Sequence, residues 1–427
     1  MTQELYYILI YILLWIISFW TASKKGNGWT SSRSIILVHL VVSVLSLLLF
    51  IHPNYQTEFQ GLTLFPFIYL FTLITISLIP VIKYDNGNNN RLIAPSMQFI
   101  KLFLISYVII SLVVLPSSFM NIREGIVLLL TDDTAGAALY GEAHGKKLSY
   151  SAFYGFCSAI HNCFFEVFVF FSFIYFCLKN SSKKLLWVVI VIIVLELLAP
   201  LASGLRTNTT MVFFTLINAS VLFFPFLQES IRKVVKRMAI VLCIIVAVPF
   251  VLLTLSRFGN SDTGATGAVI NYAGQAPLMF NLYCLDAGGM REGNRTCNTF
   301  KSMLGFSDVP NGVMETRMKY SNMPIDDGYF TTYVGDFVLD FGPYYAAILF
   351  IIISNIFAYI TKRKRNHISC HQLLIVYCAG CISLQGSMYL FNYSFKGNYT
   401  IIAWVITYFL LRGMLNNGKI LLIERKK

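Results

Sequence analysis

The chain has 427 residues, of which 56% are hydrophobic and only 12% are charged. A soluble globular domain carries about 25% charged residues. The composition therefore indicates a polytopic membrane protein and excludes a soluble catalytic domain of useful size. The net charge is +13. The excess of Lys and Arg in cytoplasmic loops of a membrane protein accounts for it, so nucleic-acid binding is not needed to explain it.

The predicted helices follow from apolar runs, because a hydrocarbon core of about 30 Å needs about 20 apolar residues per helix. The first run has no basic segment before it and no small-residue cleavage site, so we expect a retained helix and not a signal peptide. The runs are residues 5–21, 35–52, 62–82, 99–119, 152–178, 185–203, 208–227, 238–255, 330–360, 371–391 and 399–416. The sequence thus predicts an all-α fold with about eleven transmembrane helices.

Lysine and arginine gather in alternate connections, after the first, third, fifth, seventh and ninth runs and at the end of the chain. Because cytoplasmic loops carry the excess of these residues, the N-terminus is expected outside and the C-terminus in the cytoplasm. The same assignment places two long loops outside, at 120–151 and 256–329. We therefore divide the chain into helices 1–8 (residues 1–255, including the 120–151 loop), a large outer loop (256–329), and helices 9–11 with a basic cytoplasmic tail (330–427).

Arg206 interrupts an apolar stretch, in the turn Ser-Gly-Leu-Arg-Thr at residues 203–207. One interpretation is an arginine that reaches to the outer membrane interface. The other is an arginine that points into a cavity and binds an anion. The helix that starts at Thr207 would direct free N–H groups outward, which suits a phosphate.

Three carboxylates within or beside predicted spans are candidates for a chemical role. Glu196 stands about two turns below Arg206, where an ionisable residue is costly unless it is paired or faces water. Asp336 and Asp340 are four residues apart near the start of the ninth span, so they share one helix face. Glu196 is either a structural partner for an arginine or a group with a direct chemical role. The structural interpretation of Asp336 and Asp340 is an acid at a helix N-terminus and its neighbour, stabilised by the helix dipole, and the alternative is again a direct chemical role.

The outer loop contributes further arginines. Arg257 ends the eighth span, and Arg291 and Arg295 flank Glu292 in a glycine-rich turn. Such a turn can present N–H groups and guanidinium groups to phosphate, although a solvated loop is the commoner meaning. Residues 268–284 have the pattern of an amphipathic helix that could lie on the outer leaflet.

Two of the nine cysteines, Cys284 and Cys297, fall in this outer loop, where an oxidising compartment would permit a disulfide. No P-loop, dinucleotide-binding glycine motif, HExxH or CxxC occurs, and no histidine has metal-ligand spacing to another. The sequence therefore predicts no cofactor and no metal.

The layout and a few residues resemble the Wzy-type oligosaccharide repeat-unit polymerases of bacterial O-antigen and capsule pathways. The resemblance covers the whole chain in topology. In residues it is confined to 203–207, Arg257 and 335–342. It implies a metal-independent membrane glycosyltransferase that uses undecaprenyl-pyrophosphate-linked oligosaccharides at the periplasmic face of the inner membrane. It also implies a chain-length regulator as a further partner.

This chemistry suits the residues. Pyrophosphate is the leaving group, so it needs cations where charge develops, and the fork of an arginine fits phosphate better than a lysine. A carboxylate must take the proton of the acceptor hydroxyl. The candidates for pyrophosphate binding are Arg206, Arg257, Arg291 and Arg295. The candidates for the base are Asp336, Asp340 and Glu196.

Two alternatives remain open. One is the O-antigen ligase, which has the same architecture but passes the glycan to lipid A core. The other is a lipid-linked oligosaccharide flippase, which is a transporter. A flippase should carry arginines along the centres of many helices, whereas here the arginines of the outer half gather at one face.

Overall fold

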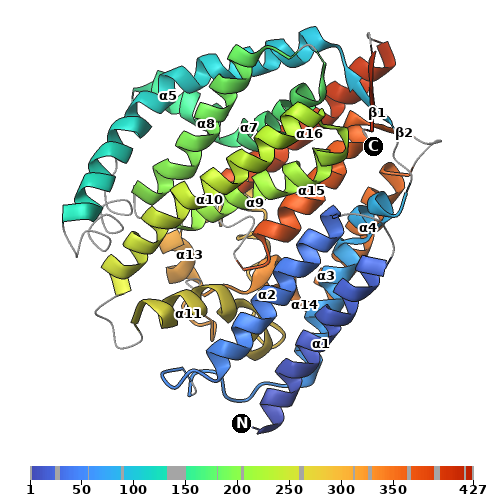
Figure 1. The fold of residues 1–427 in the computed structure, drawn as a ribbon. Coiled ribbons are helices and arrows are strands. Elements are labelled where there is room, and N and C mark those ends of the chain that lie inside the picture. Colours follow the sequence, from blue (N-terminus) through green and yellow to red (C-terminus); the bar gives the residue numbers. More distant parts are fainter. Residues whose placement is uncertain are drawn as a thin grey trace. The chain divides into compact units, whose positions relative to one another are not determined.

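The computed structural model describes most of the chain and is predominantly helical (Figure 1). The described residues are 2–24, 29–55, 57–87, 91–131, 151–179, 181–202, 206–258, 264–310, 313–325, 329–362, 367–388, 395–417 and 420–425. The chain forms two compact units. Each is considered separately.

The first unit contains both the N-terminal helices and the predicted outer loop. Its elements are α1 (Thr2–Lys24), α2 (Ser31–Phe50), α3 (Leu64–Ser77), α4 (Ile79–Asp85), all but the first two residues of α11 (Gly264–Met279), the π-helix η2 (Phe280–Cys284), α12 (Asn298–Met303), α13 (Val313–Lys319) and α14 (Thr332–Ile360). Most of α15 (Cys370–Gln385) and the start of α16 (Phe395–Asn417) also belong to it.

The second unit contains the central helices and a small sheet. Its elements are β1 (Arg91–Pro95), α5 (Met97–Thr131), α7 (Ala152–Cys177), α8 (Lys183–Ala202), α9 (Arg206–Phe223), the 3-10 helix η1 (Phe224–Phe226), α10 (Glu229–Phe258), β2 (His367–Ser369) and β3 (Ile420–Glu424). The remaining parts of α15 and α16 complete it.

The membrane character of the fold is confirmed, but the number of spans is not eleven among the described residues. Eight helices there are long and apolar enough to cross a membrane, or nine if the bent pair α3 and α4 is one span. The helix α10, which contains the predicted span 238–255, is not among them, and α15 is shorter. Each predicted apolar run nevertheless overlaps a helix, and the run 62–82 overlaps the two helices α3 and α4.

The sequence did not predict the small sheet, whose strand order is β2-β1-β3. Leu92 of β1 lies opposite Ile368 in the parallel pairing with β2 and opposite Ile423 in the antiparallel pairing with β3. All three side chains are buried. One face of the sheet therefore packs inward, although each strand is too short to give a periodic signal in the sequence.

The two predicted outer loops differ from expectation. The helix α5 continues to Thr131, past the predicted start of the 120–151 loop, and residues 132–150 lie outside the described part. The described part of the 256–329 loop contains three α-helices and a π-helix. In it α11 runs across the direction of α2 (Figure 1) and packs against it. A Cβ on Gly274 would lie 2.5 Å from the Leu45 carbonyl oxygen, and Ser46 Oγ donates to the Gly274 carbonyl at 2.7 Å. This helix is thus partly buried against the protein.

The helix α14 is broken at Gly342, where φ is 76° and ψ is 164°. A straight helix would separate Tyr333 from Phe350 by about 26 Å, at about 1.5 Å per residue. Their ring centroids instead lie 5.7 Å apart, and the rings of Phe337 and Phe350 lie 5.3 Å apart. The segment before Gly342 therefore doubles back on the segment after it. Residues 343–360, about 18 in number, are near the lower limit for a transmembrane helix.

Contacts with α3 and with the loop fix the break. The Tyr333 hydroxyl contacts Ser77 Oγ, and the Tyr69 hydroxyl donates to the Pro343 carbonyl at 2.5 Å, so the first half of α14 runs antiparallel to α3. Pro343 has no N–H to donate to the Leu339 carbonyl four residues earlier. The Arg291 backbone N–H donates to that carbonyl instead, at 2.9 Å.

Replacing Gly342 with alanine should destabilise the protein by about 1–3 kcal/mol, because this region of φ and ψ is essentially restricted to glycine. A Cβ there would also lie 3.1 Å from Met290 Sδ. The matched control is Gly413→Ala on α16, where no neighbouring atom lies within 4 Å. Thermal unfolding of the purified proteins in detergent checks the difference. Equal midpoints for the two variants would contradict the break at Gly342.

Candidate functional site

The predicted site residues fall into two groups, one in each unit. The first unit holds four of them: Arg291, Arg295, Asp336 and Asp340. The second unit holds the other three: Glu196, Arg206 and Arg257.

In the first unit, the two arginines and two aspartates are all buried. Arg291 and Arg295 are 1% and 4% exposed, and Asp336 and Asp340 are 3% and 1% exposed. Arg295 Nε lies 2.9 Å from Asp336 Oδ1, which makes a buried ion pair. The charges of both arginines act on the Asp340 carboxyl group. The cluster therefore contains equal numbers of cationic and acidic side chains.

Asp340 joins the first half of α14 to the loop. Its Oδ2 accepts hydrogen bonds from the Thr296 backbone N–H at 2.7 Å and from Thr296 Oγ1 at 2.6 Å. Its Oδ1 has no hydrogen-bond partner in the described part of the chain. Asn398 of α16 donates to the Thr296 carbonyl at 3.0 Å. Thr296 thus connects three segments that are distant in sequence.

The glycine-rich turn at 291–295 is folded and buried, with only Glu292 exposed. The Tyr320 hydroxyl donates to the Arg291 carbonyl at 3.0 Å, and Asn294 Nδ2 donates to the Tyr320 oxygen at 2.5 Å. Lys301 Nζ donates to Asn294 Oδ1 at 2.6 Å. The commoner expectation of a solvated loop is therefore wrong for this turn.

The contacts give this cluster a structural explanation. A buried charge is tolerated when it is paired, and removal of one partner leaves an uncompensated charge. The charges of Arg295 and Asp336 are paired in this way. The predicted roles of these four residues, in pyrophosphate binding and in proton transfer, stay predictions, and burial places their side chains away from a substrate in this conformation.

Cys284 and Cys297 are both free thiols, so the predicted disulfide is not formed in the structure. Burial raises the pKa of each thiol above its ordinary value. Cys284 packs beside Gly335 of α14, where a Cβ would lie 3.3 Å from its Sγ. Here the cysteine acts as a small apolar residue.

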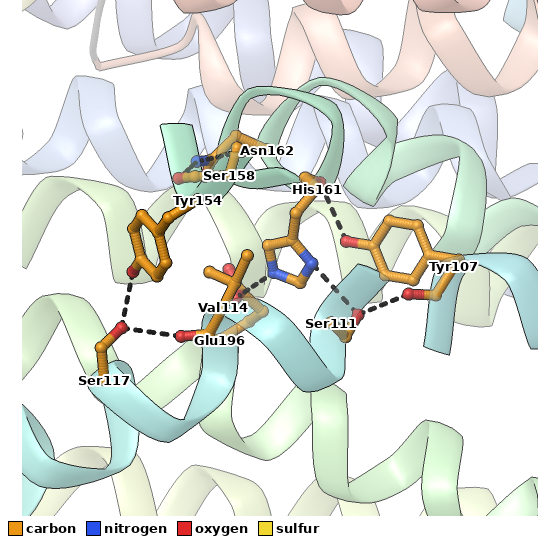
Figure 2. Close-up of polar contacts among 9 residues, drawn as sticks. All are labelled: Tyr107, Ser111, Val114, Ser117, Tyr154, Ser158, His161, Asn162 and Glu196. Carbon is orange, nitrogen blue, oxygen red and sulfur yellow. Dashed lines mark hydrogen bonds and ion pairs between the residues drawn. The ribbon is translucent and has the colours of Figure 1, made fainter. Parts of the chain in front are cut away.

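Among the described side chains of the second unit, the partner of Glu196 is a histidine (Figure 2). Glu196 Oε1 lies 2.6 Å from His161 Nε2. The two residues come from α8 and α7. The His161 side chain is 1% exposed, whereas the Glu196 side chain is 17% exposed. Glu196 Oε2 makes no hydrogen bond within the described residues.

Hydrogen bonds and ring stacking fix the His161 side chain in one position. Its Nδ1 lies 3.1 Å from Ser111 Oγ on α5, and its ring stacks on Tyr107 with centroids 5.0 Å apart. The Tyr107 hydroxyl donates to the His161 carbonyl at 2.9 Å. Both ring nitrogens are occupied, so the position and orientation of the imidazole are fixed.

Further polar side chains lie around the pair (Figure 2). The Tyr154 hydroxyl on α7 contacts Ser117 Oγ on α5 at 2.5 Å, and Asn162 Nδ2 donates to the Ser158 carbonyl at 2.8 Å. Such a concentration is unusual in spans that are otherwise apolar, and intramembrane polar groups commonly mark substrate or proton sites. We name the set of Ser111, Ser117, Tyr154, His161 and Glu196 the polar cluster.

The two arginines of this unit stand at helix ends. Arg206 opens α9 and Arg257 lies in the last turn of α10, and their side chains lie outside the described part. Since α8 packs against both helices and the connections between them are short, the end of α8, the start of α9 and the end of α10 point the same way. Glu196 lies about 9 Å below the end of α8, at about 1.5 Å per residue.

An apolar cavity of about 270 Å³ lies among α7, α8, α9 and α10. Phe176, Ile193, Phe213 and Val235 line it, one from each helix. Leu197, the residue after Glu196, also lines it. The helix that carries the paired carboxylate therefore also borders an apolar space.

Sequence reasoning selected Glu196 but missed His161 as its partner. The available signal was weak. A polar residue interrupts three apolar spans, Ser111, His161 and Glu196, each in the half of its span expected to face outward. Polar residues at similar depth in different spans can meet, but nothing in one sequence shows which helices are neighbours.

Within the described residues, no group of three or more histidine, cysteine or acidic side chains could hold a metal ion. No protein-family model matches the chain, and no significant match is found among curated proteins or among solved structures.

A double-mutant cycle tests the buried ion pair. Arg295→Met or Asp336→Leu alone should cost about 3–5 kcal/mol, because each leaves one buried charge unpaired, whereas a buried pair replaced by apolar residues is often neutral. The double variant should regain most of the lost stability. Thermal unfolding in detergent measures all four proteins. A double variant no more stable than either single variant would contradict the pairing.

Proposed function

We propose that this protein polymerises undecaprenyl-pyrophosphate-linked oligosaccharide repeat units into O-antigen or capsular polysaccharide. The reaction is glycosyl transfer at the periplasmic face of the bacterial inner membrane, with lipid pyrophosphate as the leaving group. The observation that carries the proposal is the polar cluster, in which a partly exposed carboxylate is fixed by a buried histidine. It lies in the unit whose helix ends carry Arg206 and Arg257.

The reaction requires a base, cations for the pyrophosphate and an apolar space for the lipid chain, and the second unit has residues for each. A carboxylate takes the proton from the sugar hydroxyl of the acceptor. Arginines neutralise the charge that develops on the departing pyrophosphate, and Arg206 at the start of α9 would act together with the free N–H groups of that helix end. The apolar cavity among α7, α8, α9 and α10 suits part of a polyprenyl chain.

The orientation belongs to the proposal. The Lys and Arg distribution favours a periplasmic N-terminus and a cytoplasmic C-terminus. With that orientation, the junction of α8 and α9 faces the periplasm, and so does the end of α10. Glycan polymerisation on a lipid carrier needs the reacting groups on that side, where the completed repeat unit is presented.

Arg206→Lys tests the role of the guanidinium group. An arginine that only reaches to the membrane interface would tolerate lysine, whereas a pyrophosphate-binding arginine would not, because lysine lacks the planar fork. Loss of one preorganised charge contact commonly reduces the rate by about 10²–10³. We expect cells with this variant to accumulate lipid-linked single repeat units and to make little long polymer.

The matched control is Arg123→Lys on α5, since Arg123 is an exposed arginine near the predicted outer end of its helix. It should give normal chain lengths on a polysaccharide gel, at equal protein abundance in the membrane. Normal chain lengths in both Arg206→Lys and Arg206→Ala would refute the anion-binding role. Loss of lipid-linked repeat units from the periplasmic leaflet would instead favour a flippase.

A further inference from the structure

We infer that Glu196 is the catalytic base of the proposed glycosyl transfer and that His161 is its positioning residue. The inference rests on the proposed function and deepens it, because the sequence leaves the base open among Asp336, Asp340 and Glu196. It also gives a role to a histidine that no sequence motif indicates.

The first argument is access. A base must approach the proton that it removes to hydrogen-bond distance. The Asp336 side chain is 4% exposed and contacts Arg295, and Asp340 is 1% exposed with Oδ2 held by Thr296. The Glu196 side chain is 17% exposed, and its Oε2 is not used by another described residue. Asp340 Oδ1 is also unused by the described residues, but it is buried, so Glu196 is the one of the three carboxylates whose unused oxygen belongs to a partly exposed side chain.

The second argument is orientation. One carboxylate oxygen of Glu196 is fixed by His161 at 2.6 Å, which directs the other oxygen away from the histidine. The imidazole is itself fixed by Ser111 and by the Tyr107 ring. A fully buried ring with both nitrogens occupied cannot touch the sugar, so His161 acts through Glu196.

The third argument concerns Ser111, which can serve His161 in either protonation state. The Ser111 hydroxyl donates to the Tyr107 carbonyl at 2.8 Å, which leaves its oxygen free to accept from a protonated Nδ1. By rotating, the same hydroxyl donates to an unprotonated Nδ1. Neither state leaves a ring nitrogen without a partner, so the Glu196–His161 pair persists while protons move.

The transfer makes one bond and breaks one bond at the anomeric carbon. The acceptor hydroxyl oxygen forms a bond to the anomeric carbon of the donor glycan, and its proton passes to Glu196 Oε2. The bond between the anomeric carbon and the pyrophosphate oxygen breaks, and its electron pair leaves with the lipid pyrophosphate. The protonated Glu196 returns its proton to water before the next transfer.

The test measures polymer formation by membranes from lipid-linked repeat units that are isolated from cells lacking the protein. Glu196→Gln should lower kcat by about 10²–10⁴, the range for general acid–base catalysis, with KM for the repeat unit unchanged. Glu124→Gln, an exposed glutamate on α5, is the control and should retain the wild-type rate.

A second set of variants separates positioning from structure. His161→Phe should lower kcat about tenfold or more at equal protein abundance, and His161→Gln, whose side-chain amide can donate to Glu196, should recover part of it. The double variant His161→Phe with Glu196→Gln should be no slower than Glu196→Gln alone, because a positioning residue acts only through its partner. A histidine with a purely structural role would lower the rate in both backgrounds.

The outcomes distinguish the two proposals. A wild-type rate in Glu196→Gln, with loss of kcat in Asp336→Asn or Asp340→Asn, overturns the inference and leaves polymerisation standing. An additional loss in the double variant overturns the role of His161. If wild-type membranes do not extend the isolated repeat units, both the function and the inference fail.

Discussion

An unpaired charge inside a membrane protein is costly, and this constraint organises the polar interior of the chain. Isolated ionised groups are unfavourable in an apolar environment unless they are paired or reach water. Arg295 meets Asp336, and Glu196 meets His161. Each pair joins segments that are distant in sequence, so the cost of burying charge becomes a condition on how the helices and the loop are arranged.

The broken helix α14 follows from the same constraint applied to the backbone. Pro343 leaves the Leu339 carbonyl without its helical donor, and the Arg291 N–H supplies a replacement. Irregular backbone at membrane depth is tolerated only where other parts of the protein satisfy it. The loop therefore folds into the first unit, and its arginines become buried. The more exposed carboxylate remains in the second unit, where no other described residue bonds to its second oxygen.

Hydropathy was sufficient to predict where the helices lie, but not how many of them are long and apolar enough to cross a membrane. The shared face of Asp336 and Asp340 followed from their spacing, and both are indeed buried. Their partners did not follow, because Thr296 lies 44 residues from Asp340 and His161 lies 35 residues from Glu196. Contacts at such separations depend on which helices are neighbours. The pair Gly342-Pro343 was visible in the sequence as a possible helix break, but the high hydropathy of 330–360 led to the prediction of one continuous helix.

The most direct test of the account is reconstitution of the purified protein in liposomes with lipid-linked repeat units isolated from cells that lack it. The account predicts a ladder of lipid-linked glycans that differ by one repeat unit, with one undecaprenyl pyrophosphate released per linkage and no requirement for nucleotide sugars. Repeat units that remain single, although intact cells carrying the protein polymerise them, would contradict it.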